Sequence, residues 1–200
     1  MKNNIITQFL SQDGNDCFLS PKGNDCFLPE LMTEDGTIVR LCPIDKTAHR
    51  PLYCSRDGRF FSYCRRTDII TGVSRRVLNQ IKVDTTPTVN HRACHTRYPR
   101  LSSQGGAICH FLMAFVWIGP RPIIDGIRYE CDHVNGDRLD WRADNLQWVT
   151  PKENRRRARY LRVMRACGFD PRIFSTENFM YWFSMPFDEF KTFFNHYKND

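Results

Sequence analysis

The order of hydrophobic and polar positions predicts β structure over residues 31–64. Two hairpin signals, Asp35-Gly36 and Asp57-Gly58, each lie between short runs rich in apolar or aromatic residues. Residues 65–106 are harder to assign, because they combine the strand-like piece VLNQIKV with the polar, loop-like stretch NHRACHTRYPRLSSQGG.

The next part of the chain predicts a helix followed by two strands. The apolar run 107–117 fits a short buried helix, although periodicity alone leaves a strand open, and GPRP at 119–122 ends it. Residues 127–131 alternate between apolar and polar positions, and residues 146–149 make a second short strand. The turn residues Asn135-Gly136 lie between these two strands.

A helix is predicted over residues 151–167. Thr150 suits the N-cap, Pro151 suits the first helical position, and Glu153 would complete a capping box. Gly168 suits the position just past the helix end. The order strand, loop, strand, helix follows.

Both ends of the chain carry patterns of their own. In residues 169–200 one helical face is aromatic, which predicts a small helical cap; its members are Phe187, Phe190, Phe194 and Tyr197. At the N-terminus GNDCFL occurs at 14–19 and again at 23–28, which indicates a local duplication. We do not expect these copies to form a metal site from Asp16, Cys17, Asp25 and Cys26.

Composition and charge narrow the class of protein. The 200 residues are 41% hydrophobic, so the chain can bury a core as one domain or a core with appendages. The net charge is +7, and residues 154–165 hold six arginines and no acid. Such a cluster favours polyanions, although a basic surface also simply keeps a protein soluble.

Cysteine usage and hydropathy point to a reducing compartment. The nine cysteines are an odd number without a CxxC pair, and the N-terminus lacks the apolar core of a signal peptide. We expect reduced thiols and a cytoplasmic protein, in a bacterial or phage-infected cell, with no membrane partner. A structural zinc is not expected, because knuckle spacing is absent among His91, Cys94, His95, Cys109 and His110.

The candidate chemistry lies in CDHVNGDRLDWRADNLQWVTPKENRRR, residues 131–157. Asp132 and His133 lie where the first strand ends, so the turn can re-aim their side chains. A helix packed across the hairpin would place Asn154 opposite Asp132, giving two oxygen ligands of the kind Mg²⁺ prefers. His133 would take a proton from water, and the arginines would hold a phosphate backbone. Together these residues are an inventory for phosphodiester hydrolysis.

The same segment resembles the ββα-metal finger of HNH endonucleases, most closely the homing enzymes of phages and introns. The pattern includes Asp132-His133, NLQWVT at 145–150 and Asn154. The resemblance implies His133 as general base, Asp132 and Asn154 as ligands of Mg²⁺ or another divalent cation such as Mn²⁺, and Asn145 as a brace of the loop and the histidine. Fainter likenesses lie upstream, in CHFLMAF at 109–115 and YCSRDGR at 53–59.

Departures from the family pattern keep other interpretations open. The family's Asn-Asn pair is Asp140-Trp141 here, and Phe111 rather than Arg follows His110. Asp140 accepts hydrogen bonds but cannot donate them when ionised, and Trp141 cannot replace an amide. The loop would then be braced differently, or the site weakened, and a DNA-binding protein without cleavage is the alternative.

Structural explanations compete for single residues as well. His133 could be a surface histidine, Asp132 a turn residue and Asn154 an ordinary polar residue of the first helical turn. Two interpretations, DNA contact and a solvated helix face, are open for Arg155, Arg156, Arg159 and Arg162. We expect Trp148 and Phe115 in the core, and we assign no role to Glu130 or Asp137.

We therefore predict an α+β protein with a ββα-metal finger core, a β-rich N-terminal region and a helical C-terminal tail. The predicted parts are an extension at 1–48, a β-rich DNA-binding region at 49–106, the nuclease core at 107–167 and an aromatic tail at 168–200. The predicted function is a divalent-metal-dependent endonuclease on double-stranded DNA, of homing or nicking type. An HNH restriction or packaging nuclease is a further alternative. One finger cuts one strand, so a monomer would nick and a double-strand break would need a homodimer or two binding events.

Overall fold

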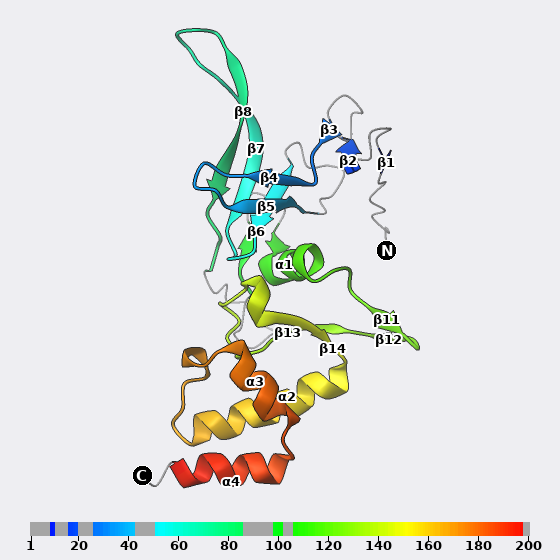
Figure 1. Cartoon of the computed structure of the whole chain (residues 1–200), viewed down its shortest axis with the longest axis vertical. Helices are drawn as coiled ribbons and strands as arrows, with labels where there is room; N and C mark the ends of the chain where they lie inside the picture. Colours follow the sequence, from blue (N-terminus) through cyan, green and yellow to red (C-terminus); the bar gives the residue numbers. More distant parts are fainter. Residues whose placement is uncertain are drawn as a thin grey trace, which may run out of the picture.

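A five-stranded antiparallel sheet occupies one end of the elongated chain (Figure 1). In this computed structural model, which describes residues 9–10, 16–19, 26–42, 51–85, 98–101 and 106–197, the strand order is β4-β5-β6-β7-β8. The strands are β4 (Glu30–Met32), β5 (Ile38–Leu41), β6 (Leu52–Ser55), β7 (Phe60–Thr67) and β8 (Ser74–Ile81). The sheet therefore crosses the boundary that we expected at residue 48.

Glycines at the predicted turns allow the two hairpins of this sheet to close. Gly36 has a φ of 80° and Gly58 a φ of 94°, a region that residues with a Cβ rarely adopt. Both hairpin predictions are confirmed. The strand-like piece VLNQIKV lies largely in β8, as expected.

The repeat at the N-terminus pairs with itself. Strands β1 (Phe9–Leu10), β2 (Asp16–Leu19) and β3 (Cys26–Phe27) form a small sheet, and Phe18 and Leu19 of one copy pair with Phe27 and Cys26 of the other. The side chains named for a metal site in this repeat lie outside the described residues.

The second half of the chain alternates short hairpins with helices. The hairpins are β9 (Arg100–Leu101) with β10 (Ala107–Ile108), β11 (Ile123–Ile124) with β12 (Ile127–Arg128), and β13 (Glu130–His133) with β14 (Leu146–Val149). The helices are α1 (Cys109–Trp117), α2 (Pro151–Ala166), α3 (Thr176–Ser184) and α4 (Phe187–Tyr197), with short 3₁₀ turns at Ala143–Asn145 and Pro171–Ile173. The helix expected at 107–117 is confirmed, and the fold is α+β.

The strand predicted at residues 127–131 is divided in two. Asp125 and Gly126 both have positive φ and turn the chain tightly, so Ile127 and Arg128 pair with β11 instead of β14. The Tyr129 amide donates to the Pro122 carbonyl oxygen at 3.2 Å, which extends the β11–β12 pairing by one residue. The strand that pairs with β14 therefore starts later and continues through His133.

Helix α2 begins and ends where the sequence predicts. The Thr150 hydroxyl accepts a hydrogen bond from the Glu153 amide at 3.1 Å, and Gly168 follows the helix with a φ of 87°. The second half of the expected capping box is not formed, since the Glu153 carboxylate accepts from Arg156 and Arg157 instead.

Three apolar clusters pack the described parts of the chain, and the smallest joins Val39, Tyr53 and Phe61 of the sheet. One of the two larger clusters joins the sheet to α1 and β14 through buried side chains that include Leu52, Phe60, Met113 and Leu146. The other packs α2 against α3 and α4 through residues that include Tyr160, Phe179, Phe190 and Phe194, which confirms the aromatic helical cap. Trp148 packs on the first of these two clusters, whereas Phe115 is 37% exposed and is not a core residue.

None of the described helices is both long and apolar enough to cross a membrane. The cysteines whose side chains are described are free, and the buried ones are Cys42, Cys54, Cys109 and Cys167.

Candidate active site

The β13–β14 hairpin separates the Asp132 and His133 side chains onto its two faces. Asp132 pairs with Gln147 and His133 with Leu146, so the ladder still runs at both positions. Adjacent residues on a strand point to opposite sides. The expectation that the turn re-aims them is wrong, because the turn starts only after His133: Asp132 contacts α2, and His133 contacts α1.

The face toward α2 gathers carboxylates around one buried arginine. The Asp132 carboxylate is 3.6 Å from Arg157 Nη1 and accepts from Gln147 Nε2 at 3.2 Å. Arg157 Nε donates to Glu153 at 2.7 Å. Burial raises the pKa of Asp132 to about 7, which Arg157 opposes and the charges of Glu153 and Glu130 reinforce.

Asn154 reaches this face but contacts a different acid from the one we expected. Its Nδ2 donates to Glu130 Oε2 at 2.7 Å. Glu130 lies two residues before Asp132 and therefore on the same face of β13. We had assigned no role to Glu130, although the period-two rule of a strand would have identified it. Arg157, also unassigned, is 8% exposed and is the cation nearest to Asp132.

The opposite face buries the His133 ring among aromatic rings. His133 is 5% exposed, and its ring centroid is 5.0 Å from that of His110 and 5.8 Å from that of Tyr98. Its Nε2 is buried without a hydrogen-bond partner among the described residues. Burial lowers the pKa of His133 to about 4; Arg138 lowers it further, and Asp140 and Asp137 oppose the shift.

His110 shares this environment. It is 2% exposed, as expected for a buried histidine, and its Nδ1 also has no partner within the described part of the chain. Burial, with smaller effects of His133 and Arg138, lowers the pKa of His110 to about 3. Both imidazoles are therefore neutral at pH 7.

Asn145 braces the loop between the two strands. Its Oδ1 accepts from the Asn135 amide at 3.0 Å, and its Nδ2 donates to Asn135 Oδ1 at 2.9 Å and to the Asp140 carbonyl oxygen at 2.8 Å. Its own carbonyl oxygen accepts from the Val134 amide at 2.8 Å. The hydrogen bonds brace the loop that starts directly after His133.

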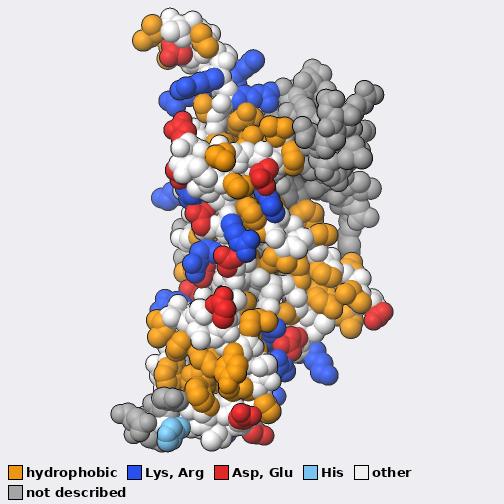
Figure 2. Space-filling model, viewed as in Figure 1, with side chains coloured by type: hydrophobic (Ala, Val, Ile, Leu, Met, Phe, Trp, Pro, Cys, Tyr) orange, Lys and Arg blue, Asp and Glu red, His pale blue; other side chains and the backbone are white. Residues whose placement is uncertain are grey.

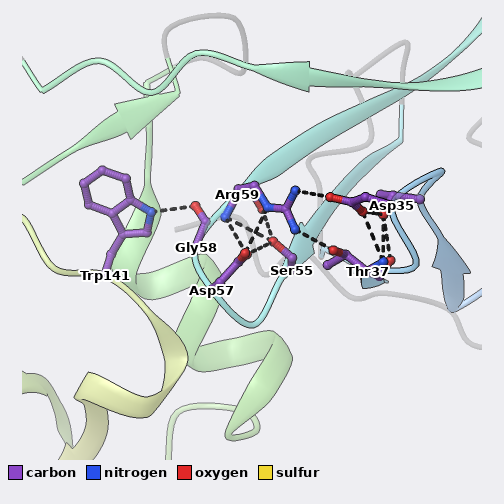
Figure 3. A network of polar contacts seen from close by, with 8 residues as sticks. Asp35, Thr37, Ser55, Asp57, Gly58, Arg59 and Trp141 are labelled. Atoms are coloured by element: carbon purple, nitrogen blue, oxygen red, sulfur yellow. Dashed lines mark hydrogen bonds and ion pairs between the residues drawn. The ribbon is translucent and has the colours of Figure 1, made fainter. Parts of the chain in front are cut away.

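The two residues that depart from the family pattern also hold this loop. The Asp140 carboxylate accepts from Asn135 Nδ2 at 3.0 Å and from Arg142 at 2.8 Å. Trp141 Nε1 donates to the Gly58 carbonyl oxygen at 2.8 Å, and a Cβ on Gly58 would lie 3.0 Å from that nitrogen (Figure 3). The indole of Trp141 therefore tethers the loop to the β6–β7 turn.

This tether ends on a polar network that spans two turns of the sheet. Figure 3 shows Arg59 between the Asp57 and Asp35 carboxylates, at 2.9 and 2.8 Å. A second link lies nearby, where the Ala143 amide donates to the Arg56 carbonyl oxygen at 3.0 Å. The loop of the β13–β14 hairpin and the five-stranded sheet therefore sit in a fixed relation.

The arginines of α2 divide into free and engaged side chains. Arg155, Arg159 and Arg162 are exposed, and the Arg159 guanidinium lies 4.3 Å from the Phe187 ring centroid. Arg156 instead donates to Glu153 and to the Phe183 carbonyl oxygen, each at 2.7 Å. Because the Arg156 guanidinium is engaged by these groups, it is the least suited of the four predicted DNA-binding arginines to bind a ligand.

Oxygen-bearing side chains lie on the face of the hairpin that packs against α2. No group of three or more His, Cys, Asp or Glu side chains among the described residues is arranged to hold a metal. Asp132, Glu130 and Asn154 nevertheless bring two carboxylates and an amide to one face. Of the residues considered for zinc, His91, Cys94 and His95 lie outside the described residues.

One comparison with known proteins gives a match. Residues 122–156 match the family model described as HNH endonuclease. This segment runs from β11 into the first turns of α2 and contains all four residues of the predicted site. No curated protein and no solved structure matches the chain.

Proposed function

From its HNH endonuclease segment at residues 122–156, we propose that this protein is a divalent-metal-dependent DNA endonuclease built on a ββα-metal finger. The observation that carries the proposal is the pair Asp132 and His133. A buried carboxylate with a raised pKa and a buried imidazole with an unpartnered Nε2 occupy adjacent residues of one strand. Perturbed titratable groups gathered in this way are typical of catalytic sites.

The donor set on the α2 face fits a hard cation. Asp132 and Asn154 would hold Mg²⁺ or Mn²⁺, and Glu130 lies close enough to Asn154 to share in ligation. Burial raises the pKa of Asp132 to about 7 although Arg157 opposes the shift, and a cation bound beside the carboxyl would favour its ionised form. Such an ion, when bound, stabilises charge on the phosphate and on the departing 3′ oxygen.

His133 would act as the general base. Its imidazole is neutral at pH 7, so the unpartnered Nε2 can accept a proton from an attacking water. A pKa of about 4 makes it a weak base in the free protein. A DNA phosphate placed beside the ring would raise that pKa, because a negative charge favours the imidazolium form.

Positive side chains on both sides of the hairpin would hold the DNA backbone. Arg155, Arg159 and Arg162 are exposed on α2, whose N-terminus adds positive potential. Arg138, which the sequence analysis did not assign, is exposed beside His133, and its guanidinium lies 5.2 Å from the Tyr98 ring centroid. Arg138 would therefore meet the phosphate next to the base.

A DNA-binding protein without cleavage is the second candidate. The observation that favours it is the burial of His133, which is 5% exposed and lies against Tyr98. Cleavage would require Tyr98 to move aside from the His133 ring when DNA binds. The hydrogen bonds of Asp140 to Asn135 and of Trp141 to Gly58 weaken this alternative, since the two residues that differ from the family pattern still brace the loop.

Relaxation of supercoiled plasmid separates the two candidates. Purified protein is incubated with plasmid in Mg²⁺ or in EDTA, and binding to a labelled duplex is measured in parallel. Nicked circles that form only with Mg²⁺ support the endonuclease. Duplex binding without nicking on any DNA, including the flanking sequence of the gene, would support the non-cleaving protein.

A further inference from the structure

The last strands of the sheet extend beyond it as a two-stranded ribbon. Strand β6 pairs with β7 only at residues 60–62, whereas β7 and β8 pair with each other through eight consecutive positions, from Phe60 with Ile81 to Thr67 with Ser74. The Tyr63 amide still donates to the Pro51 carbonyl oxygen at 3.0 Å, and from Cys64 outward the two strands pair with no other described strand. Figure 1 shows this ribbon projecting from one end of the molecule.

Arginines occupy directly opposite positions on the ribbon. Arg65 pairs with Arg76, and Arg66 pairs with Arg75. Like charges in opposite positions destabilise a sheet. Because successive residues alternate between faces, one arginine pair lies on each face of the ribbon. Such a local conflict between sequence and stability is typical of a functional site.

Few groups within the protein compensate these charges. Among the described residues no ion pair involves Arg65, Arg66 or Arg75, and all three are exposed. The acid nearest in sequence, Asp68, accepts hydrogen bonds from the Ile70 and Thr71 amides of its own turn, which lower its pKa. The charges of Arg65, Arg66 and Arg75 are therefore accessible to a ligand outside the chain.

The tip of the ribbon is apolar and almost fully in water. Ile69 is 98% exposed, Ile70 is 95% exposed and Val73 is 63% exposed. Figure 2 shows hydrophobic atoms at this end of the molecule, next to acidic atoms, with Lys and Arg atoms toward the body of the protein. Apolar side chains at a tip, with cations behind them on both faces, fit a groove whose walls are phosphates and whose base steps can take an apolar wedge.

We propose that the β7–β8 ribbon enters a groove of the duplex DNA that the β13–β14 hairpin would cut, at a distance from the cleavage site. Arg65, Arg66 and Arg75 would bind phosphates on the two walls, and Ile69 and Ile70 would wedge against a base step. The inference rests on the proposed function and narrows the DNA-binding region expected at 49–106 to one element. Since Trp141 and Arg56 fix the nuclease loop to the same sheet, the ribbon would set where the cut falls.

The salt dependence of binding tests the arginines. Anisotropy of a labelled 40-base-pair duplex is measured in EDTA, so that nothing is cut, for wild type and for Arg65→Gln/Arg66→Gln/Arg75→Gln. Loss of three phosphate contacts should lower the slope of log K against log salt by about 2–3 and weaken binding on the order of 100-fold at 150 mM salt. Arg66→Gln/Arg75→Gln, which changes one face, should be intermediate.

The matched control removes the same charge elsewhere. Arg40→Gln/Arg172→Gln/Lys191→Gln should weaken binding less than about threefold, since these charges lie away from the ribbon and are screened. A ribbon variant that binds like this control would overturn the proposal. Loss of like-charge pairs does not destabilise a sheet, so the ribbon variant is expected to melt at or above the wild-type temperature.

A mismatched duplex tests the wedge. Unstacking costs less at a mismatch, so wild type should bind a duplex with a central T·T mismatch about tenfold more tightly than the perfect duplex. Ile69→Ser/Ile70→Ser should lose this preference and keep the salt slope. An unchanged preference, or a ribbon that matters for double-stranded RNA but not for DNA, would contradict the proposal.

These outcomes are distinguishable from failure of the nuclease itself. Ribbon-dependent binding without any nicking would refute the proposed function and leave the ribbon as a DNA-binding element. Metal-dependent nicking by a protein whose duplex affinity is unchanged in the ribbon variants would refute the inference about the ribbon and leave the proposed function standing. A wild-type protein that binds no duplex would refute both.

Discussion

Replacing Asp132 by Asn should make the metal-free protein more stable at alkaline pH. Burial raises the pKa of this carboxyl from 3.8 to about 7. Between these values the folded protein holds a proton that the unfolded chain has lost, so wild-type stability falls as pH rises through this window. Each pH unit corresponds to about 1.4 kcal/mol, and ionised Asp132 therefore costs about 4 kcal/mol at pH 8.

Urea unfolding in EDTA, followed by tryptophan fluorescence, measures the effect. At pH 5 the wild type has lost only the smaller part of this stability. The stability difference between Asp132→Asn and wild type should therefore grow by about 3 kcal/mol from pH 5 to pH 8. Glu34→Gln changes an exposed acid in a turn and serves as the control, with a difference that stays nearly constant. Added Mg²⁺ should stabilise wild type more than Asp132→Asn, because the substitution removes one anionic ligand from the set that Asn154 and Glu130 complete.

A stability difference that is independent of pH would refute the argument. So would an Asp132→Asn protein that is less stable than wild type at pH 8, since the ionised carboxylate would then be favourably paired. Stabilisation of the variant by Mg²⁺ as strong as that of wild type would remove Asp132 from the metal site.

Three further substitutions test the contacts around the hairpin by urea unfolding. Gly58→Ala should cost about 1–2 kcal/mol more than Gly72→Ala, because both have positive φ but only Gly58 lies against Trp141; equal losses would contradict the tether. Asn145→Ala should cost about 2–4 kcal/mol, since it leaves buried loop groups unpaired, and a loss under about 1 kcal/mol would contradict its bracing role. Thr150→Ala should cost about 1 kcal/mol through loss of the helix cap, and Thr150→Ser should restore it.

Local signals in the sequence predicted most of the elements. Gly36 and Gly58 mark the turns of the sheet because only glycine adopts positive φ readily there. Thr150 and Gly168 mark the limits of α2, since caps act within a few residues of the helix end. Where one competing turn intervened, at Asp125, the strand prediction failed.

Contacts between distant parts of the chain were not predictable in the same way. The hydrogen bond of Trp141 to Gly58 joins residues 83 positions apart, and no periodicity encodes it. The engagement of Arg156 by the Phe183 carbonyl oxygen depends on how α3 packs. By contrast, the place of Glu130 beside Asp132 follows from strand alternation and was available in the sequence.

The single-turnover rate of plasmid nicking by wild type and by His133→Ala tests the central claim most directly. With Mg²⁺ present and DNA saturated by either protein, loss of a general base should slow nicking by about 10²–10⁴-fold while duplex affinity stays within about threefold. A His133→Ala protein that nicks within about tenfold of the wild-type rate would contradict the assignment of His133 as the base of this site.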